Sequence, residues 1–102
     1  MDCMKVRIEW DPAKAALNLR KHGLSFEIAT WVFADPDALF QRDGNVAGEL
    51  RWQILGVVDG FAMLTVAQSV EERDEVEAIR IVSARRANRK ERRRYEKEND
   101  SI

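Results

Sequence analysis

The sequence predicts a small α+β domain, and three patterns support this fold class. Residues 6–10 alternate apolar and charged side chains, as a half-buried strand does. Two strong helix-start signals follow before residue 37, and from there to about residue 82 the apolar pattern has a period of two. The chain has 102 residues, a usual length for one core, so we expect a single domain over residues 1–102. The expected order is β-α-α, an antiparallel β meander and a C-terminal helix.

The first helix is expected directly after a strand at Val6–Trp10. Asp11 can accept hydrogen bonds from free backbone N–H groups, and Pro12 has no N–H to leave unpaired at the first helical position. The helix should end near His22, because Gly23 can adopt the left-handed conformation that terminates helices.

A second helix is expected after Ser25, which is a favourable N-cap residue. Its apolar stripe at helical spacing consists of Phe26, Ala29, Val32 and Phe33. The segment Asp35-Pro36-Asp37 should stop this helix, because the residue before a proline disfavours the helical region.

The meander is expected to begin at residue 38. Ala38–Arg42 predicts a short strand that leads into a turn at Asp43-Gly44-Asn45. Arg51–Val58 and Phe61–Ser69 then flank Asp59-Gly60, a pair that is typical of a tight two-residue hairpin.

The C-terminal part of the chain should complete the sheet and add a helix. Glu71–Asp74 predicts a second, acidic turn, and Glu75–Val82 predicts the next strand. Ser83 is then expected to cap a final helix that runs from Ala84 to about Glu98. The helices would pack on one sheet, which is the α+β arrangement.

Charge is distributed unevenly along the chain. Residues 1–79 carry eight Lys and Arg against fourteen Asp and Glu, whereas residues 80–97 carry nine Lys and Arg against two Asp and Glu. Such asymmetry indicates that one end of the fold meets a polyanion. The rest of the surface would be an ordinary solvated one, or would meet a basic partner.

Three arginines near the end of the meander are candidate phosphate ligands. Arg80 lies in a largely apolar stretch, so we expect its guanidinium to be half-buried and to need an anion, either a local carboxylate or a phosphate. If Ser83 caps the final helix, Arg85 and Arg86 occupy its first turn, where the helix dipole disfavours cations. Two guanidinium groups beside free N–H groups form a good oxyanion cradle, although both side chains can also simply point into solvent.

Other polar residues have two interpretations each. Arg89 and its basic neighbours on the final helix can contact phosphates or form a solvated face. Tyr95 is either a core contact with a satisfied hydroxyl or a hydroxyl aimed into the site. His22 is either a cation that favours the helix C-terminus or a proton carrier. Glu49 and Arg51 are either a rim ion pair or a carboxylate base and a further phosphate ligand.

Several other functions are disfavoured. One His and one Cys are too few for a zinc site of nitrogen and sulfur ligands, and the chain has no glycine-rich phosphate loop. We therefore expect neither a metal nor a cofactor. No apolar run is long enough to cross a bilayer, and the N-terminus lacks the organisation of an export signal. A lone cysteine suits a reducing compartment, so the expected location is the cytoplasm, with no membrane contact.

A set of short runs resembles one known family. These runs are Glu9–Lys14, Asn18, Lys21–Gly23, Ser25-Phe26, Val32–Pro36, Gly48–Arg51, Ile79–Ala87, Glu91-Arg92 and Tyr95. Each run is weak alone, but their order and spacing over residues 8–96 resemble those of the BrnT toxins, which are ribonucleases of type II toxin–antitoxin systems.

The resemblance implies a RelE-like toxin fold, metal-independent RNA cleavage and inhibition of translation. It also implies a small BrnA-like antitoxin with a ribbon-helix-helix segment, and binding of operator DNA only through the toxin–antitoxin complex. The positions that match the family's pattern and are carried over as site residues are Lys21, His22, Glu49, Arg51, Arg80, Ser83, Arg85, Arg86 and Tyr95.

A mechanism follows from the residue types as a hypothesis. RNA supplies its own nucleophile, the 2′-hydroxyl, so the enzyme must hold the phosphate, move protons and stabilise charge. Arg80, Arg85 and Arg86 suit the phosphate, and His22 or Glu49 suit proton transfer, with Tyr95 a weaker candidate. Two alternatives stay open: a non-enzymatic module that binds nucleic acid or the ribosome, and a module that only docks the antitoxin.

Overall fold

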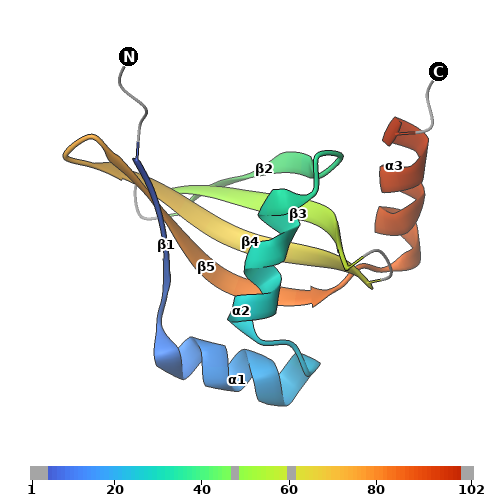
Figure 1. The fold of residues 1–102 in the computed structure, drawn as a ribbon, viewed down its shortest axis with the longest axis horizontal. Coiled ribbons are helices and arrows are strands. Elements are labelled where there is room, and N and C mark those ends of the chain that lie inside the picture. The colour runs from blue at the N-terminus through green and yellow to red at the C-terminus, as the bar shows by residue number, and fades with distance from the viewer. Residues whose placement is uncertain (1–4, 47–48, 60–61, 100–102) are drawn as a thin grey trace.

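A computed structural model describes residues 5–46, 49–59 and 62–99. The described residues form one five-stranded sheet in the order β1-β5-β4-β3-β2, with helices α1 and α2 and the 3-10 helix η1 against one face and helix α3 at one end (Figure 1). The strands are β1 (Lys5–Trp10), β2 (Leu39–Val46), β3 (Glu49–Val58), β4 (Ala62–Arg73) and β5 (Val76–Arg86). The helices are α1 (Pro12–His22), α2 (Phe26–Ala29), η1 (Thr30–Ala34) and α3 (Arg89–Asn99).

This arrangement confirms the predicted α+β class and the predicted order of elements. Strands β2 to β5 pair antiparallel as a meander, and β1 joins the edge of β5 in parallel. None of the helices in the described ranges combines the length and apolar character that a membrane crossing requires.

Helix α1 begins and ends at the predicted residues. The Asp11 carboxylate accepts a hydrogen bond from the Ala13 N–H at 2.9 Å, and Pro12 is the first helical residue. Gly23 has a φ of +70° and donates its N–H to the Leu19 carbonyl at 2.8 Å. A residue with a Cβ would be strained at this φ, so glycine is the residue that allows the chain to turn here.

The second helix is capped by Ser25 as predicted, but it changes type after one turn. The Ser25 hydroxyl accepts a hydrogen bond from the Ile28 N–H at 3.1 Å. The chain then continues as the 3-10 helix η1 and leaves the helical conformation at Asp35. Three residues of the predicted apolar stripe, Phe26, Ala29 and Val32, are fully buried.

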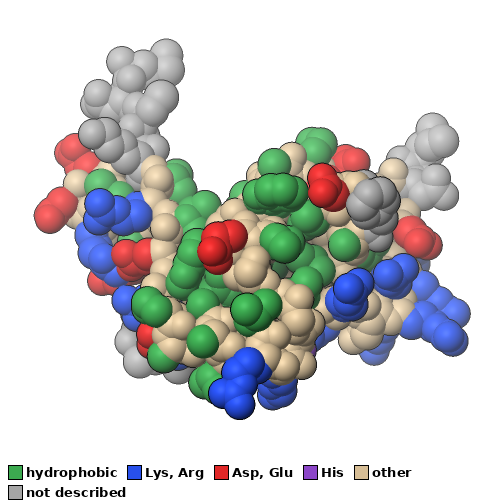
Figure 2. All heavy atoms as spheres, turned by 60° about the horizontal axis from the view of Figure 1, so that its bottom comes forward, with side chains coloured by type: hydrophobic (Ala, Val, Ile, Leu, Met, Phe, Trp, Pro, Cys, Tyr) green, Lys and Arg blue, Asp and Glu red, His purple; other side chains and the backbone are tan. Residues whose placement is uncertain are grey.

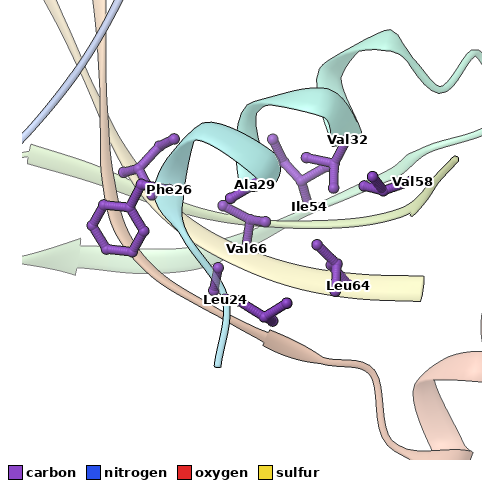
Figure 3. Close-up of a cluster of buried hydrophobic side chains, with 10 residues drawn as sticks. Leu24, Phe26, Ala29, Val32, Ile54, Val58, Leu64 and Val66 are labelled. Atoms are coloured by element: carbon purple, nitrogen blue, oxygen red, sulfur yellow. The ribbon is translucent and has the colours of Figure 1, made fainter. Parts of the chain in front are cut away.

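The core lies between these helices and the sheet (Figure 3). Its buried members are Leu24, Phe26, Ala29, Val32, Ile54, Val58, Leu64, Val66, Ile81 and Ala84. The ring of Trp10 packs edge-on against Phe26, with the ring centroids 6.1 Å apart. A Cβ at Gly56 would lie 3.2 Å from the Val32 Cβ, so glycine in β3 lets η1 approach the sheet closely.

Two of the predicted turns are wrong. The chain does not turn at Asp43-Gly44-Asn45: β2 runs on to Val46, and the register against β3 shifts between Arg42 and Asn45. Gly44 has a φ of +91°, so the residues that favour a turn form a bulge inside a strand instead.

The hairpin after β3 also differs from the prediction. A two-residue turn at Asp59-Gly60 would pair Val58 with Phe61, whereas Val58 pairs with Ala62. Gly60 and Phe61 lie outside the described residues.

The tight two-residue turn occurs one hairpin later, at Asp74 and Glu75. Their φ values are +47° and +66°, and Arg73 pairs with Val76 across the turn. The acidic turn predicted at Glu71–Asp74 therefore begins later, because β4 keeps pairing with β5 through Arg73.

The predicted start of the last helix is wrong. Ser83 does not cap a helix, because β5 continues to Arg86 and pairs with β4 up to Leu64. Asn88 is the cap of α3: its side chain accepts the Glu91 N–H at 2.8 Å, and the Glu91 carboxylate accepts the Asn88 N–H at 2.9 Å. Long-range strand pairing and complete burial of Ala84 outweigh the local preference of Ser83 for a cap.

Candidate functional site

Four polar residues form one row across the sheet. Glu9 pairs with Arg80, Arg80 with Ser69, and Ser69 with Arg51, so the row crosses strands β1, β5, β4 and β3. Directly paired residues point to the same face of a sheet. The neighbours of the row in sequence, such as Ile81, enter the core, so the row lies on the opposite face. We call these four residues the arginine row, and the face away from α1 and α2 the open face.

Arg80 is half-buried, as the sequence suggested. Its side chain is 50% exposed. The alternation of β5 explains this position, because the apolar neighbours point to the core face while Arg80 points to the opposite face. Among the described residues its ion pair is to Glu9, and this contact is long at 3.9 Å. Arg80 can therefore take up an anion without losing a close contact.

The Glu9 carboxylate is held mainly by Arg73. The Arg73 guanidinium lies 2.8 Å from Glu9 and 3.0 Å from Glu71, and these hydrogen bonds raise the pKa of Arg73. Glu9 thus stands between a close arginine and a distant one. This arrangement leaves Arg80 free to bind another acceptor while it keeps the guanidinium near the row.

Arg51 supplies the second cation of the row. Its Nε atom is buried and has no hydrogen-bond partner among the described residues. A buried donor without an acceptor is costly, so the group is suited to bind an anion that enters the open face. Glu49 begins β3 and its backbone pairs with Val46, but the side chain of Glu49 lies outside the described part of the structure.

A bulge in β5 separates the two arginines that were expected together. Gln68 pairs with Ile81 but Ala67 pairs with Ser83, so Val82 is an extra residue. This shift places Ser83 and Arg85 on the open face with Arg80. Ala84 and Arg86 point to the opposite side, where Ala84 is part of the core. The expected cradle of Arg85 and Arg86 in a helix N-terminus is therefore wrong.

Arg85 already has a partner. Its two terminal nitrogens lie 2.8 and 2.9 Å from the two carboxylate oxygens of Glu91 on α3. Hydrogen bonds from Arg85 outweigh burial and, with the Asn88 backbone N–H, lower the pKa of Glu91 to about 2. A phosphate that approached Arg85 would have to compete with this bidentate pair.

Tyr95 fixes α3 to the rest of the molecule. Its hydroxyl donates a hydrogen bond to the Asp35 carboxylate at 2.7 Å, and the same carboxylate oxygen accepts the Val57 N–H at 2.8 Å. Burial and the contact with Asp35 raise the pKa of Tyr95. Of the two interpretations of this residue, the geometry matches a contact with a satisfied hydroxyl.

Lys21 and His22 lie on the other side of the sheet, at the end of α1. Asn18, one helical turn before His22, is buried and bonds to the backbone of Ala84 through both its nitrogen (2.9 Å) and its oxygen (3.1 Å). Helix α1 thus runs beside β5 toward the strand's end, where Arg86 points to the same side (Figure 1).

Seven of the ten predicted site residues therefore fall into two groups, while Arg89 and Tyr95 belong to α3 and the side chain of Glu49 lies outside the described part of the structure. Arg51, Arg80, Ser83 and Arg85 share the open face. Lys21, His22 and Arg86 belong to the side of α1, and Arg89 is exposed in the first turn of α3. Figure 2 shows Lys and Arg side chains at the end of the molecule that carries α3, with further ones at the opposite end and along the lower edge, and hydrophobic side chains between them.

Sequence reasoning missed Glu9, Ser69 and Arg73. Glu9 was recognised only as a polar position of the first strand. Its role depends on parallel pairing between β1 and β5, which joins the two ends of the chain and leaves no local signal. No group of three or more His, Cys, Asp or Glu side chains suited to a metal ion occurs within residues 5–46, 49–59 and 62–99.

Comparisons with known proteins point to one family. A family model described as "Ribonuclease toxin, BrnT, of type II toxin-antitoxin system" matches residues 10–91. Among solved structures, the chain is similar to the crystal structure of the Brucella abortus ribonuclease toxin BrnT, with a TM-score of 0.56. The identity is 22%, and the alignment covers 83% of this chain and 99% of that chain, so this likeness concerns the fold. No curated protein matches the chain.

Proposed function

The chain belongs to the family of BrnT ribonuclease toxins of type II toxin–antitoxin systems, and from this premise we propose that it cleaves RNA on the open face without a metal ion. The single observation that carries the proposal is the arginine row, in which Arg80 is half-exposed and the buried Nε of Arg51 lacks an acceptor. Two cations separated by one buried serine suit a phosphodiester bound across β4.

The proposed reaction uses the nucleophile that RNA carries. The 2′-oxygen attacks the phosphorus, the bond from phosphorus to the 5′-oxygen breaks, and a 2′,3′-cyclic phosphate and a 5′-hydroxyl are formed. Arg51 and Arg80 stabilise the charge that develops on the phosphate oxygens. One group takes the 2′ proton, and another returns a proton to the 5′-oxygen.

We rank the acid–base candidates by their contacts. Glu9 in the arginine row, and Glu49, two residues before Arg51 in β3, are the carboxylates we propose for the 2′ proton. Tyr95 ranks below them, because its hydroxyl is already donated to Asp35. A role for His22 and Arg86 requires RNA to pass around the end of β5 to the side of α1, where these residues contact a flanking nucleotide.

The cellular role follows from the same premise. We propose that the toxin acts in the cytoplasm as one domain over residues 1–102, and that RNA cleavage inhibits translation. A BrnA-like antitoxin with a ribbon-helix-helix segment would neutralise it, and operator DNA would be bound only by the complex of the two proteins. A type II toxin requires a protein antitoxin, and this requirement supports the proposed partner.

The test compares two double variants in excess EDTA. The purified chain is incubated with total RNA beside Arg51→Ala/Arg80→Ala, and Lys14→Ala/Arg20→Ala is the control because it removes the same charge from exposed positions of α1. We expect the native chain and the control to cleave RNA and leave cyclic-phosphate ends, and the open-face variant to cleave at least about 100-fold more slowly. Circular dichroism establishes that both variants fold.

Three results would contradict the proposal. If both double variants lost the same activity, the loss would not be specific to Arg51 and Arg80, and the open face would not be the site of cleavage. Cleavage of DNA, or a strict requirement for Mg²⁺, would exclude attack by the 2′-hydroxyl without a metal. Binding of RNA without cleavage, also on translating ribosomes, would instead favour a non-enzymatic binding module.

A further inference from the structure

A groove with apolar walls lies on the side of the sheet that carries α1, beside η1. Its lining consists of six apolar residues and two polar ones: Phe33, Phe40, Leu50, Trp52, Val70 and Ile79, with Gln68 and Glu77. We call this set of eight residues the apolar groove. Phe40 is 57% exposed, so the groove is accessible in the folded chain.

The apolar surface continues across four strands. Ile8 pairs with Ile79, Ile79 with Val70, and Val70 with Leu50, so one apolar residue from each of β1, β5, β4 and β3 forms a continuous stripe. Ile8 is 37% exposed at the edge of the sheet. Four strands span about 15 Å, which is the length of about ten helical residues. Ile79 is only 7% exposed and forms the floor of the stripe, and Ile8 and Phe40 supply exposed apolar surface beside it. Contiguous exposed apolar surface of this kind marks interaction sites.

A buried polar side chain, Gln68, lies on one side of the stripe and needs a hydrogen-bond donor. Its side chain is 3% exposed, and its carbonyl oxygen has no hydrogen-bond partner among the described residues. Buried acceptors of this kind are rare because they lose hydration without compensation. An occupant that donates a hydrogen bond would satisfy this oxygen.

Acidic residues border the other side of the stripe. Glu77 lines the groove and is directly paired with Glu72, and the exposed Asp74 and Glu75 form the turn beyond them. Like charges directly opposite one another destabilise a pair of strands, and a cationic occupant would relieve this repulsion. The acidic border also disfavours RNA, and it disfavours a second copy that docks through the same face, because that face would bring the same charges.

We propose that the apolar groove binds the antitoxin through a short amphipathic helix that carries apolar residues and, at one end, Lys or Arg. This inference rests on the proposed function only in that a type II toxin has a protein antitoxin. It places the antitoxin on the side of the sheet opposite the arginine row. RNA and antitoxin would then use different faces of the same sheet.

The test measures the affinity of the purified chain for the antitoxin co-expressed from its own operon. Phe40→Glu is the groove variant, and Leu17→Glu is the matched control, since Leu17 is 63% exposed on α1 outside the groove. We expect Phe40→Glu to weaken binding at least about 100-fold and Leu17→Glu by less than about threefold. The charge reversal Glu72→Lys/Glu77→Lys should also weaken binding.

The variant Gln68→Leu distinguishes a role in antitoxin binding from a role in stability. Removal of the unpaired carbonyl oxygen should leave the chain at least as stable as the native one, while the affinity for the antitoxin falls. A loss of both properties would mean that Gln68 has a purely structural role and would contradict its assignment to the binding site.

The open-face variant separates this inference from the proposed function. Arg51→Ala/Arg80→Ala should bind the antitoxin with unchanged affinity even though it no longer cleaves RNA. If this variant loses the antitoxin while Phe40→Glu keeps it, the groove is not the docking site. If free native chain forms a dimer that Phe40→Glu dissociates, a second copy is the occupant and the proposal is wrong. If the native chain did not cleave RNA, the proposed function would be wrong, but the measured affinity for the antitoxin would still test the groove.

Discussion

The ion pair between Arg85 and Glu91 is a bidentate contact between the sheet and α3. Both nitrogens of the guanidinium fork meet both oxygens of the carboxylate, and the same carboxylate accepts the Asn88 N–H. The Glu91 side chain is 12% exposed and that of Arg85 is 38% exposed, so solvent weakens the pair only in part. The pair connects the end of β5 with the first turn of α3.

This pair makes the stability of the fold depend on pH. The pKa of Glu91 falls from 4.5 to about 2 on folding. Its contribution to the free energy of unfolding is therefore present above pH 4.5 and is lost as the pH falls toward 2. We expect Glu91→Gln to be less stable than the native chain by about 1 kcal/mol at neutral pH, and the difference to shrink as the pH falls from 4.5 and to vanish below pH 2. Urea unfolding at a series of pH values measures it.

The control for this prediction is Glu96→Gln, which removes an exposed carboxylate from the same helix. At neutral pH we expect it to destabilise the chain less than Glu91→Gln does, because the Glu96 side chain is exposed. Parallel stability curves for the native chain and Glu91→Gln would show that the ion pair does not contribute to folding.

The sequence predicted the arginines of the open face correctly but not the polar residues that pair with them. Arg51 and Arg80 were selected because of their residue type and their position in a strand, and both belong to the arginine row. Glu9 and Ser69 join the row only through strand register, which single-sequence patterns do not specify. The pairing of Arg85 with Glu91 could not be predicted either, because it depends on the residue at which α3 begins.

At the scale of elements, the last helix was predicted to begin after Ser83, but α3 begins after Asn88. Asn88 and Glu91 hydrogen-bond each other's backbone N–H groups, which is a capping box. Asn88→Ala removes the cap and should cost about 1 kcal/mol, which lowers the melting temperature by about 4 °C. Thermal unfolding followed by circular dichroism measures the change.

Ser83→Ala is the matched control for the cap. Ser83 lies within β5 and pairs with Ala67, so its hydroxyl caps no helix and its loss should change the melting temperature little. If Ser83→Ala were the more destabilising change, the last helix would begin at residue 84.

Element types were easier to predict than element boundaries. Helix α1 has local signals at both ends, Asp11-Pro12 and Gly23, and its limits were predicted correctly. The strands extend beyond their predicted ends because each gains hydrogen bonds from a neighbour that is distant in sequence. Gly44 and Val82 lie at irregularities in paired strands, where turn-like residues or an extra residue are accommodated without ending the strand.

At the scale of the whole molecule, α3 stands apart from the core. None of its described residues is buried, and its attachments are polar. Arg94 donates to Gln41, Asn99 donates to the Asp37 carbonyl, and Tyr95 donates to Asp35. These contacts join the C-terminal helix to the segment between η1 and β2. The basic end of the chain is thus held by a few hydrogen bonds rather than by buried apolar area.

Tyr95 allows this attachment to be measured directly, because it is the one tyrosine of the chain. Burial and Asp35 raise its pKa above the ordinary value of 10.0. The neutral hydroxyl is favoured in the folded state, so its contribution to stability is complete below pH 10 and is lost as the pH rises further. We expect the tyrosinate absorbance of the folded chain to appear at higher pH than that of the unfolded chain. Asp35→Asn should move the titration back toward the ordinary value.

The three tryptophans also absorb ultraviolet light, so the tyrosinate signal must be measured against a baseline. The variant Tyr95→Phe provides this baseline, because it lacks only the titrating hydroxyl. Circular dichroism at each pH identifies the range in which the chain is folded. Within that range, a titration of the native chain at the pH of free tyrosine would mean that the hydroxyl is solvated. The link from α3 to Asp35 would then be absent in solution, and α3 would depend on Glu91, Arg94 and Asn99 for its position. A raised titration that Asp35→Asn reverses would instead establish that one hydrogen bond couples the basic helix to the far end of the helical layer.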